Sequence, residues 1–131
     1  MAFYVDTSAL TKLVVAEAES RALRTWFGKA ERQPVSSDLT RTELLRAVRR
    51  SAPDRTVRAR EVLDGLVLLR ATVEIFETAA LLEPRTLRTL DSVHLASALA
   101  LGDDLEGMVV YDERLADAAR SVGIAVIAPG T

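Results

Sequence analysis

Residues 1–10 read Met-Ala-Phe-Tyr-Val-Asp-Thr-Ser-Ala-Leu and combine a short apolar run, a carboxylate and the start of a helical pattern. Phe3, Tyr4 and Val5 are residue types that suit a buried strand, and the run is too short for a helix core. Asp6 ends the run, and the apolar residues after it recur at helical spacing. An aspartate at the carboxyl end of a strand in a parallel sheet lies where ligands bind, although Asp6 equally suits a helix N-cap.

The same alternation continues along the chain. We expect further strands at residues 35–37, 71–76, 107–111 and 124–127. Helical patterns lie between them, at residues 8–18, 20–30, 40–51, 55–70, 78–83, 91–101 and 113–121. This order predicts an α/β fold with a mostly parallel central sheet of about four or five strands flanked by helices.

Composition narrows the kinds of site that the chain can contain. It has no cysteine, which excludes disulfides, thiolate metal ligands and a cysteine nucleophile. No apolar run reaches the length of about 18 residues that a membrane-spanning helix needs, and the N-terminus lacks the pattern of a signal peptide. We therefore expect a soluble cytoplasmic protein with no membrane partner.

Arginines are concentrated between residues 41 and 60. The net charge of the chain is −2, but seven arginines and two acids give this segment a local charge of +5. Guanidinium groups match the geometry of phosphates. The segment is therefore either a phosphate-binding surface or a pair of solvated helix faces.

Four carboxylates occupy positions from which they could share one site. Asp6 and Asp112 each follow an apolar strand and precede a helix, so neighbouring strands would bring both to one edge of the sheet. Glu43 borders the apolar face of its helix, and Asp91 opens an apolar, alanine-rich one. Each acid also has a structural explanation as a cap, a turn or an ion-pair partner. Converging carboxylates repel unless they are protonated or bind a cation, and oxygen ligands suit Mg²⁺ or Mn²⁺.

Four segments resemble the signature blocks of PIN-domain ribonucleases, most of all the VapC toxins of bacterial toxin–antitoxin pairs. They are residues 6–10 (DTSAL), 41–47 (RTELLRA), 90–98 (LDSVHLASA) and 111–115 (YDERL). Their order and spacing match the family, and the resemblance covers nearly the whole chain. It implies a three-layer PIN-like fold and a single PIN domain over residues 1–131.

The resemblance also implies a metal-dependent endoribonuclease that cuts single-stranded or looped RNA. The acidic residues of the family correspond to Asp6, Glu43, Asp91 and Asp112, which would hold Mg²⁺ or Mn²⁺. Hydrolysis in the family leaves a 5′-phosphate and a 3′-hydroxyl. This chain departs from the pattern at Val110, where the family usually has Thr or Ser, and the missing hydroxyl leaves the placement of a second metal open.

Other residues are expected to support the site. Ser8 matches a residue that supports it by hydrogen bonding, or it simply caps a helix. Asp117 is the further carboxylate best placed to act in an outer shell, and His94, the one histidine, is interpreted as a core residue instead of a general base. The arginines expected to contact RNA are Arg41, Arg46, Arg49, Arg85 and Arg88.

Partners follow from the same resemblance. A VapB-like antitoxin would wrap the toxin and place a basic side chain in the acidic pocket, and the family forms homodimers and heterotetramers or larger assemblies. The alternatives are a PIN-like protein with a housekeeping role in RNA processing and a non-catalytic module that binds a partner. A phosphoacceptor receiver domain needs a lysine late in the chain, whereas the lysines here are Lys12 and Lys29. An aspartate-nucleophile phosphatase needs a second Asp two residues after Asp6, where Ser8 stands.

Overall fold

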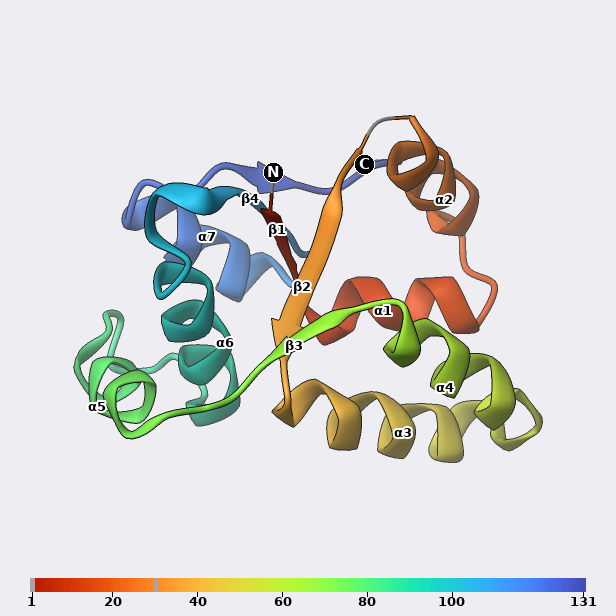
Figure 1. Ribbon diagram of the computed structural model, residues 1–131, viewed down its shortest axis with the longest axis horizontal. Helices are drawn as coiled ribbons and strands as arrows, with labels where there is room; N and C mark the ends of the chain where they lie inside the picture. The colour runs from red at the N-terminus through yellow and green to blue at the C-terminus, as the bar shows by residue number, and fades with distance from the viewer. Residues whose placement is uncertain (1, 30) are drawn as a thin grey trace.

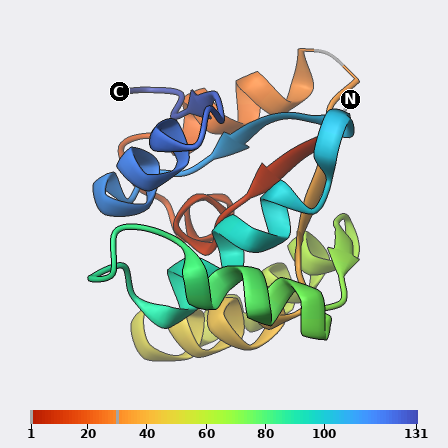
Figure 2. The ribbon, with the colours of Figure 1, turned by 90° about the vertical axis from the view of Figure 1, so that its left-hand side faces the viewer.

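The computed structural model has one five-stranded parallel sheet with helices on both faces (Figures 1 and 2). It describes residues 2–29 and 31–131. The spatial order of the strands is β3-β2-β1-β4-β5, so the N-terminal strand lies at the centre. Their bounds are β1 Ala2–Val5, β2 Gln33–Ser37, β3 Val67–Leu69, β4 Leu105–Val109 and β5 Val126–Ile127. This arrangement confirms the predicted α/β class and the parallel sheet.

Two groups of helices cover the sheet. One face carries α1 Thr7–Val14, α2 Ser20–Gly28, α3 Leu39–Ser51 and α4 Thr56–Asp64, with a short 3₁₀ turn η1 at Pro53–Arg55. The other face carries α6 Thr89–Leu99 and α7 Glu113–Ser121, and α5 Val73–Leu81 packs on α6. A second 3₁₀ turn, η2 at Gly102–Asp104, precedes β4. Among the residues described, no helix combines the length and apolar character needed to span a membrane.

Side-chain alternation along β1 produces a core on each face of the sheet. Phe3 and Val5 pack on the side of α1 to α4, together with Leu44 of α3. Tyr4 points to the opposite side, where it packs with Leu95 of α6. Successive residues of a strand face opposite sides, so three consecutive apolar residues are what a central strand covered on both faces requires.

The segment between residues 55 and 81 differs from its predicted structure. The helix predicted to reach residue 70 ends at Asp64, and the strand predicted at residues 71–76 lies earlier, at β3. Residues 73–76 instead begin α5, whose N-cap is Thr72. The first predicted helix also ends early, at Val14. Residues 1 and 30, the predicted start of the first strand and end of the second helix, lie outside the described residues.

The carboxyl ends of the strands place several acids at one edge of the sheet. Asp6 follows β1 directly and is the N-cap of α1, while Asp112 follows β4 and is the N-cap of α7. β1 and β4 are hydrogen-bonded neighbours. On its other side β1 pairs with β2, which leads through Asp38 into α3. The starts of α1, α3 and α7 therefore all lie at the carboxyl edge of the sheet.

Candidate active site

Asp6 is the most buried acid of this edge, with 4% of the residue exposed. One of its oxygens, Oδ2, accepts a hydrogen bond from the backbone N–H of Ser8 at 3.2 Å, so Asp6 does cap α1. Burial is the largest effect on the carboxyl and raises its pKa above the ordinary value. Nearby Asp91 raises the pKa further, while His94 and the Ser8 hydrogen bonds lower it. A carboxylate in this position is stabilised in its charged form by a cation.

His94 connects the buried core to Glu43. Its Nε2 atom is hydrogen-bonded to Oε1 of Glu43 and lies 3.8 Å from Oδ1 of Asp6. Its Nδ1 atom lies 2.6 Å from the hydroxyl of Tyr4. In the neutral ring with its proton on Nε2, Nε2 donates to Glu43 and the tyrosine donates to Nδ1; in the imidazolium, Nε2 donates to Glu43 and Nδ1 donates to the tyrosine hydroxyl. Thr7 donates a second hydrogen bond to Oε1 of Glu43, at 2.9 Å, so the carboxylate of Glu43 is held from two sides.

The pKa values of this pair shift in opposite directions. Burial is the largest effect on His94 and lowers its pKa, but the Glu43 hydrogen bond and the charges of Asp6, Glu43 and Asp91 together outweigh it and raise the pKa. For Glu43, burial raises the pKa, but the hydrogen bond and charge of His94 outweigh it, and the pKa is lowered. The pair therefore favours an imidazolium and a carboxylate. The interpretation of His94 as a core residue is right about its burial but missed this contact.

Arg88 bridges the other two acids. Its Nε atom donates to Oδ2 of Asp91 at 2.9 Å, and its Nη2 atom donates to Oδ2 of Asp112 at 3.3 Å. The Asp112 side chain also accepts from the backbone N–H of Leu115 at 3.0 Å and thereby caps α7. The arginine side chain is 66% exposed, whereas those of Asp91 and Asp112 are 12% and 31% exposed.

The two halves of the site interact electrostatically. The charge of Asp91 raises the pKa of Asp6, and the charges of Asp112 and Asp6 raise the pKa of Arg88 after the larger effects of its contact with Asp91. The charge of Arg88 also contributes to the lowered pKa of Glu43. The structure thus brings Asp6, Glu43, Asp91 and Asp112 together, and their catalytic assignment stays a prediction.

Ser8, Val110 and Asp117 were also singled out from the sequence, and each has a different environment. The Ser8 hydroxyl accepts a hydrogen bond from the backbone N–H of Tyr111 at 3.1 Å, which ties the start of α1 to the segment before Asp112. Val110 is buried in the core beside α6 and α7. Asp117 is an exposed residue of α7 that is ion-paired to Arg120 at 3.0 Å.

The predicted RNA-binding arginines fall into two groups. Arg41, Arg46 and Arg49 are exposed on α3, the helix that also contains Glu43. Arg85 is exposed in the loop before α6. Arg88 instead contacts the acids, as described above. Its spacing of three residues from Asp91 at the start of a helix is the sequence signal that could have revealed the ion pair.

The donor set fits a hard divalent cation, because every acid supplies carboxylate oxygens. Its most buried member, Asp6, also has a pKa raised by burial and by the like charge of Asp91. Within residues 2–29 and 31–131, however, no three acidic or imidazole side chains stand in a ready arrangement for a metal ion. The positive charge near these acids comes from Arg88 and His94.

Comparison with known proteins identifies the family. A family model described as the PIN domain matches residues 3–121. Ribonuclease VapC47 of Mycobacterium tuberculosis, strain CDC 1551 / Oshkosh, is 44% identical over 132 residues, which cover 97% of this chain and 96% of that protein. The chain belongs to the PIN-domain VapC ribonucleases. Ribonuclease VapC46 of Mycobacterium tuberculosis, strain ATCC 25618 / H37Rv, is also 44% identical, over 128 residues that cover 98% of each chain. The family predicted from the four sequence blocks is therefore confirmed.

Solved structures of VapC proteins share the fold. Mycobacterium tuberculosis VapC20, described as a sarcin-ricin loop cleaving toxin, superposes with a TM-score of 0.78 at 16% identity, covering 97% of this chain and 99% of that one. A toxin–antitoxin complex from Klebsiella pneumoniae superposes with a TM-score of 0.70 at 17% identity, covering 98% of each chain. At these identities the likeness supports the VapC fold of this chain and confirms the PIN-like architecture.

Proposed function

We propose that this VapC-family protein is a metal-dependent endoribonuclease toxin that hydrolyses RNA phosphodiesters at the Asp6–Glu43–Asp91–Asp112 cluster. The observation that carries the proposal is the meeting of these four carboxylates, which come from α3, α6 and the two strand ends at the centre of the sheet. Only Arg88 and His94 among the described residues are ion-paired to the cluster, which favours a divalent cation as its further partner.

Three of the four acids are held by contacts that do not depend on a metal. Asp6 and Asp112 are fixed by the backbone N–H groups that they cap, and Glu43 is fixed by Thr7 and His94. We infer that Mg²⁺ or Mn²⁺, bound by these carboxylates, supplies the charge that polarises the phosphodiester and activates water. These contacts restrict the three side chains, so the rearrangement that metal binding requires falls mainly on Arg88, which is hydrogen-bonded to Asp91 and Asp112.

We propose that RNA approaches along α3. Arg41, Arg46 and Arg49 are exposed on this helix, and Glu43 lies on the same helix at the edge of the acid cluster. Arginine contacts to phosphates position a strand without reading its sequence. The route therefore explains how a chain with net charge −2 can hold a polyanion beside four carboxylates.

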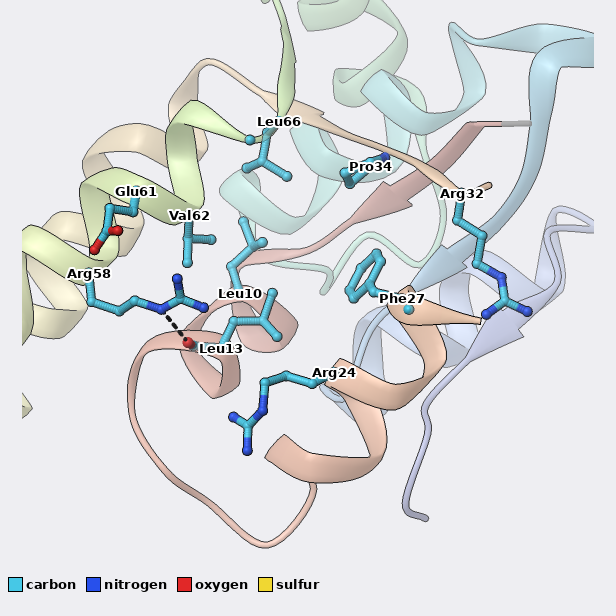
Figure 3. Close-up of a pocket in the computed structure, with 12 residues that line it drawn as sticks. Leu10, Leu13, Arg24, Phe27, Arg32, Pro34, Arg58, Glu61, Val62 and Leu66 are labelled. Atoms are coloured by element: carbon cyan, nitrogen blue, oxygen red, sulfur yellow. Dashed lines mark hydrogen bonds between the residues drawn. The ribbon is translucent and has the colours of Figure 1, made fainter. Parts of the chain in front are cut away.

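We further propose a VapB-like antitoxin as the partner in the cytoplasm, within homodimers or larger assemblies. An apolar groove with a volume of about 520 Å³ lies between α1, α2 and α4 (Figure 3). Its lining includes Leu13, Phe27 and Val62, and arginines at positions 24, 32 and 58 line it as well, against a single glutamate. This combination suits an amphipathic segment with acidic flanks. A solved VapBC2 complex from Rickettsia felis shares the fold at a TM-score of 0.67.

RNA cleavage by the purified protein tests the catalytic part of the proposal. We expect cleavage with Mg²⁺ or Mn²⁺, none with EDTA, and a loss of about 100-fold or more in Asp6→Asn, because a ligand contributes at least as much as the residues behind it. Asparagine caps helices as well as aspartate does, so this variant keeps the fold. The control is Asp103→Asn, which removes an exposed carboxylate of η2. Cleavage without metal, or full activity of Asp6→Asn, would overturn the mechanism.

The antitoxin part needs a separate measurement. Co-expression with the product of a neighbouring gene for a small DNA-binding protein should yield a complex in which cleavage is suppressed. Leu13→Glu, which places a charge in the groove, should weaken that complex and leave cleavage by the free protein intact. Cleavage that no such partner suppresses would favour a housekeeping role in RNA processing.

A further inference from the structure

The guanidinium of Arg88 occupies carboxylate oxygens that the proposed metal site needs. It donates to Oδ2 of Asp91 at 2.9 Å and to Oδ2 of Asp112 at 3.3 Å. One planar cation therefore binds two of the four acids at once, a geometry that the fork of arginine permits and the point charge of lysine does not. The positive charge that a divalent ion would supply here is already partly present.

The contact is made by the Arg88 side chain alone. The backbone of Arg88 is fixed as the N-cap residue of α6, and its carbonyl oxygen accepts a hydrogen bond from the N–H of Ser92 at 2.9 Å. Its side chain is 66% exposed and caps no helix N–H group. The guanidinium can therefore leave the two acids without any change in the helix or in the loop before it.

The two acids differ in what else holds them. Asp112 is held independently by the N–H of Leu115 at 3.0 Å. Asp91 lies in the first turn of α6, and its side chain is only 12% exposed. Because the guanidinium end of these ion pairs is 66% exposed and therefore largely hydrated, a doubly charged ion that these acids coordinate directly can replace it.

We propose that Arg88 is an intramolecular competitor of the metal ion: it binds Asp91 and Asp112 in the metal-free protein, and a divalent cation must displace it in order to bind. This inference rests on the proposed metal-dependent function and adds a regulatory contact to the same site. The competition weakens metal binding and offsets part of the negative charge of the two carboxylates until a metal binds.

Calorimetric titration of the full chain with Mn²⁺ alone tests the competition. We expect Arg88→Gln to bind Mn²⁺ more tightly than the wild type by about fivefold or more, because the ion no longer has to break the ion pairs. Arg88→Lys should fall between the two, since it keeps the charge but loses the fork. The control is Arg120→Gln, which removes another exposed arginine that is ion-paired to an aspartate, and it should bind Mn²⁺ as the wild type does.

Melting temperatures provide a second readout that does not depend on activity. Without metal, Arg88→Gln should melt at a lower temperature than the wild type, because Asp91 and Asp112 lose their counter-ion. Saturating Mn²⁺ should remove this difference, because both proteins then carry the same cation at the acids. A destabilisation that persists at saturating Mn²⁺ would show a purely structural role for Arg88 and would overturn the proposal.

The remaining outcomes distinguish a failure of the Arg88 competition from a failure of the metal-dependent function. Equal Mn²⁺ affinity of the wild type and Arg88→Gln, or an equal gain in Arg120→Gln, overturns the role of Arg88 and leaves the metal-dependent function standing. Asp6→Asn, titrated in parallel, should lose the binding and so report that the heat comes from the acid cluster. Absence of Mn²⁺ binding by both the wild type and Arg88→Gln overturns the metal-dependent function and the competition together.

Discussion

At the scale of single residues, the pairing of buried His94 with partly buried Glu43 makes the stability of the metal-free protein depend on pH. Folding raises the pKa of His94 above 6.5, so the folded chain binds this proton more tightly than the unfolded chain does. The resulting stabilisation is complete below the unfolded pKa and is lost as the pH rises through the folded pKa. Asp6, whose pKa is raised from 3.8, acts in the same direction from a lower pH. Glu43, whose pKa is lowered from 4.5, loses its stabilisation as the pH falls.

We therefore expect the free energy of unfolding in EDTA to decrease as the pH rises from 6.5. Urea denaturation at a series of pH values measures this slope, and His94→Gln should reduce it. Tyr4→Phe is the matched control, because it removes the partner of Nδ1 and costs about 1 kcal/mol but keeps the imidazole. A wild-type stability that does not change with pH above 6.5 would contradict the raised pKa of His94.

The candidate acids could be predicted from the sequence, but their counter-ions were predicted less well. Asp6 and Asp112 could be predicted because an aspartate that directly follows an apolar strand of a parallel sheet lies at the carboxyl edge of that sheet. His94 and Arg88 each lie three residues from Asp91, a spacing that places helical neighbours together. Their partners Glu43 and Asp112, however, are far away in the chain, and sequence periodicity carries no information about which face of another element a side chain will meet.

At the scale of elements, the predicted order of strands and helices is right, but the bounds predicted around β3 are wrong. Residues 66–69 are apolar throughout, and a run this short fits the end of a helix and a buried strand equally well. The structure favours a strand because Val67, Leu68 and Leu69 pair with the exposed edge of β2. That pairing is a tertiary interaction, and it decides the structure where local patterns do not.

Thr72 fixes the start of the helix that replaced the predicted strand. Its hydroxyl accepts a hydrogen bond from the N–H of Ile75 at 3.3 Å. We expect Thr72→Ala to lower the free energy of unfolding by about 1 kcal/mol, the usual contribution of an N-cap, and Thr72→Ser to leave it nearly unchanged. Denaturation in urea measures both. An alanine variant as stable as the wild type would mean that packing on α6 alone determines where α5 begins.

Gly107 allows β4 and β5 to approach each other closely. A Cβ at this position would lie 2.8 Å from Cδ1 of Ile127 and 3.0 Å from the carbonyl oxygen of Ala125, which itself accepts a hydrogen bond from Met108 at 2.8 Å. We expect Gly107→Ala to cost about 2 kcal/mol, because the side-chain tip can move but the paired carbonyl cannot.

The matched control is Gly28→Ala, at the end of α2, where a new Cβ would meet nothing within 4 Å apart from its chain neighbours and the backbone of its own helix. Since alanine favours helices, this change should leave stability unchanged or raise it by about 0.5 kcal/mol. Thermal melts of the two variants compare the stability cost of a Cβ at Gly107, where neighbouring atoms are close, with that at Gly28, where there is space. Equal effects of the two substitutions would show that backbone freedom, and not the close approach of β5, determines the cost at Gly107.

At the scale of the whole molecule, the net charge of −2 conceals an acidic region and a basic region that lie apart. The carboxylates meet where the central strands end, while exposed arginines lie along the outside of α3 and in the segment after it. The fold separates these charges because α3 enters the site at its first turns and then runs away from it (Figure 1). A polyanion can thus bind to the arginines and present one phosphate to the acids.

This separation predicts that RNA affinity depends on salt through α3. We expect the double variant Arg46→Gln/Arg49→Gln to bind RNA more weakly in EDTA, where cleavage is suppressed, and to reduce the slope of log affinity against log salt by about 0.7 for each lost phosphate contact. Cleavage at saturating RNA and Mn²⁺ should change little, because neither arginine touches the acids. The control double variant Arg21→Gln/Arg120→Gln has the same net charge but keeps α3 intact. Fluorescence anisotropy over a salt series measures both slopes. Equal losses of affinity in the two double variants would show that overall charge accounts for RNA binding. RNA would then not reach the acids along α3.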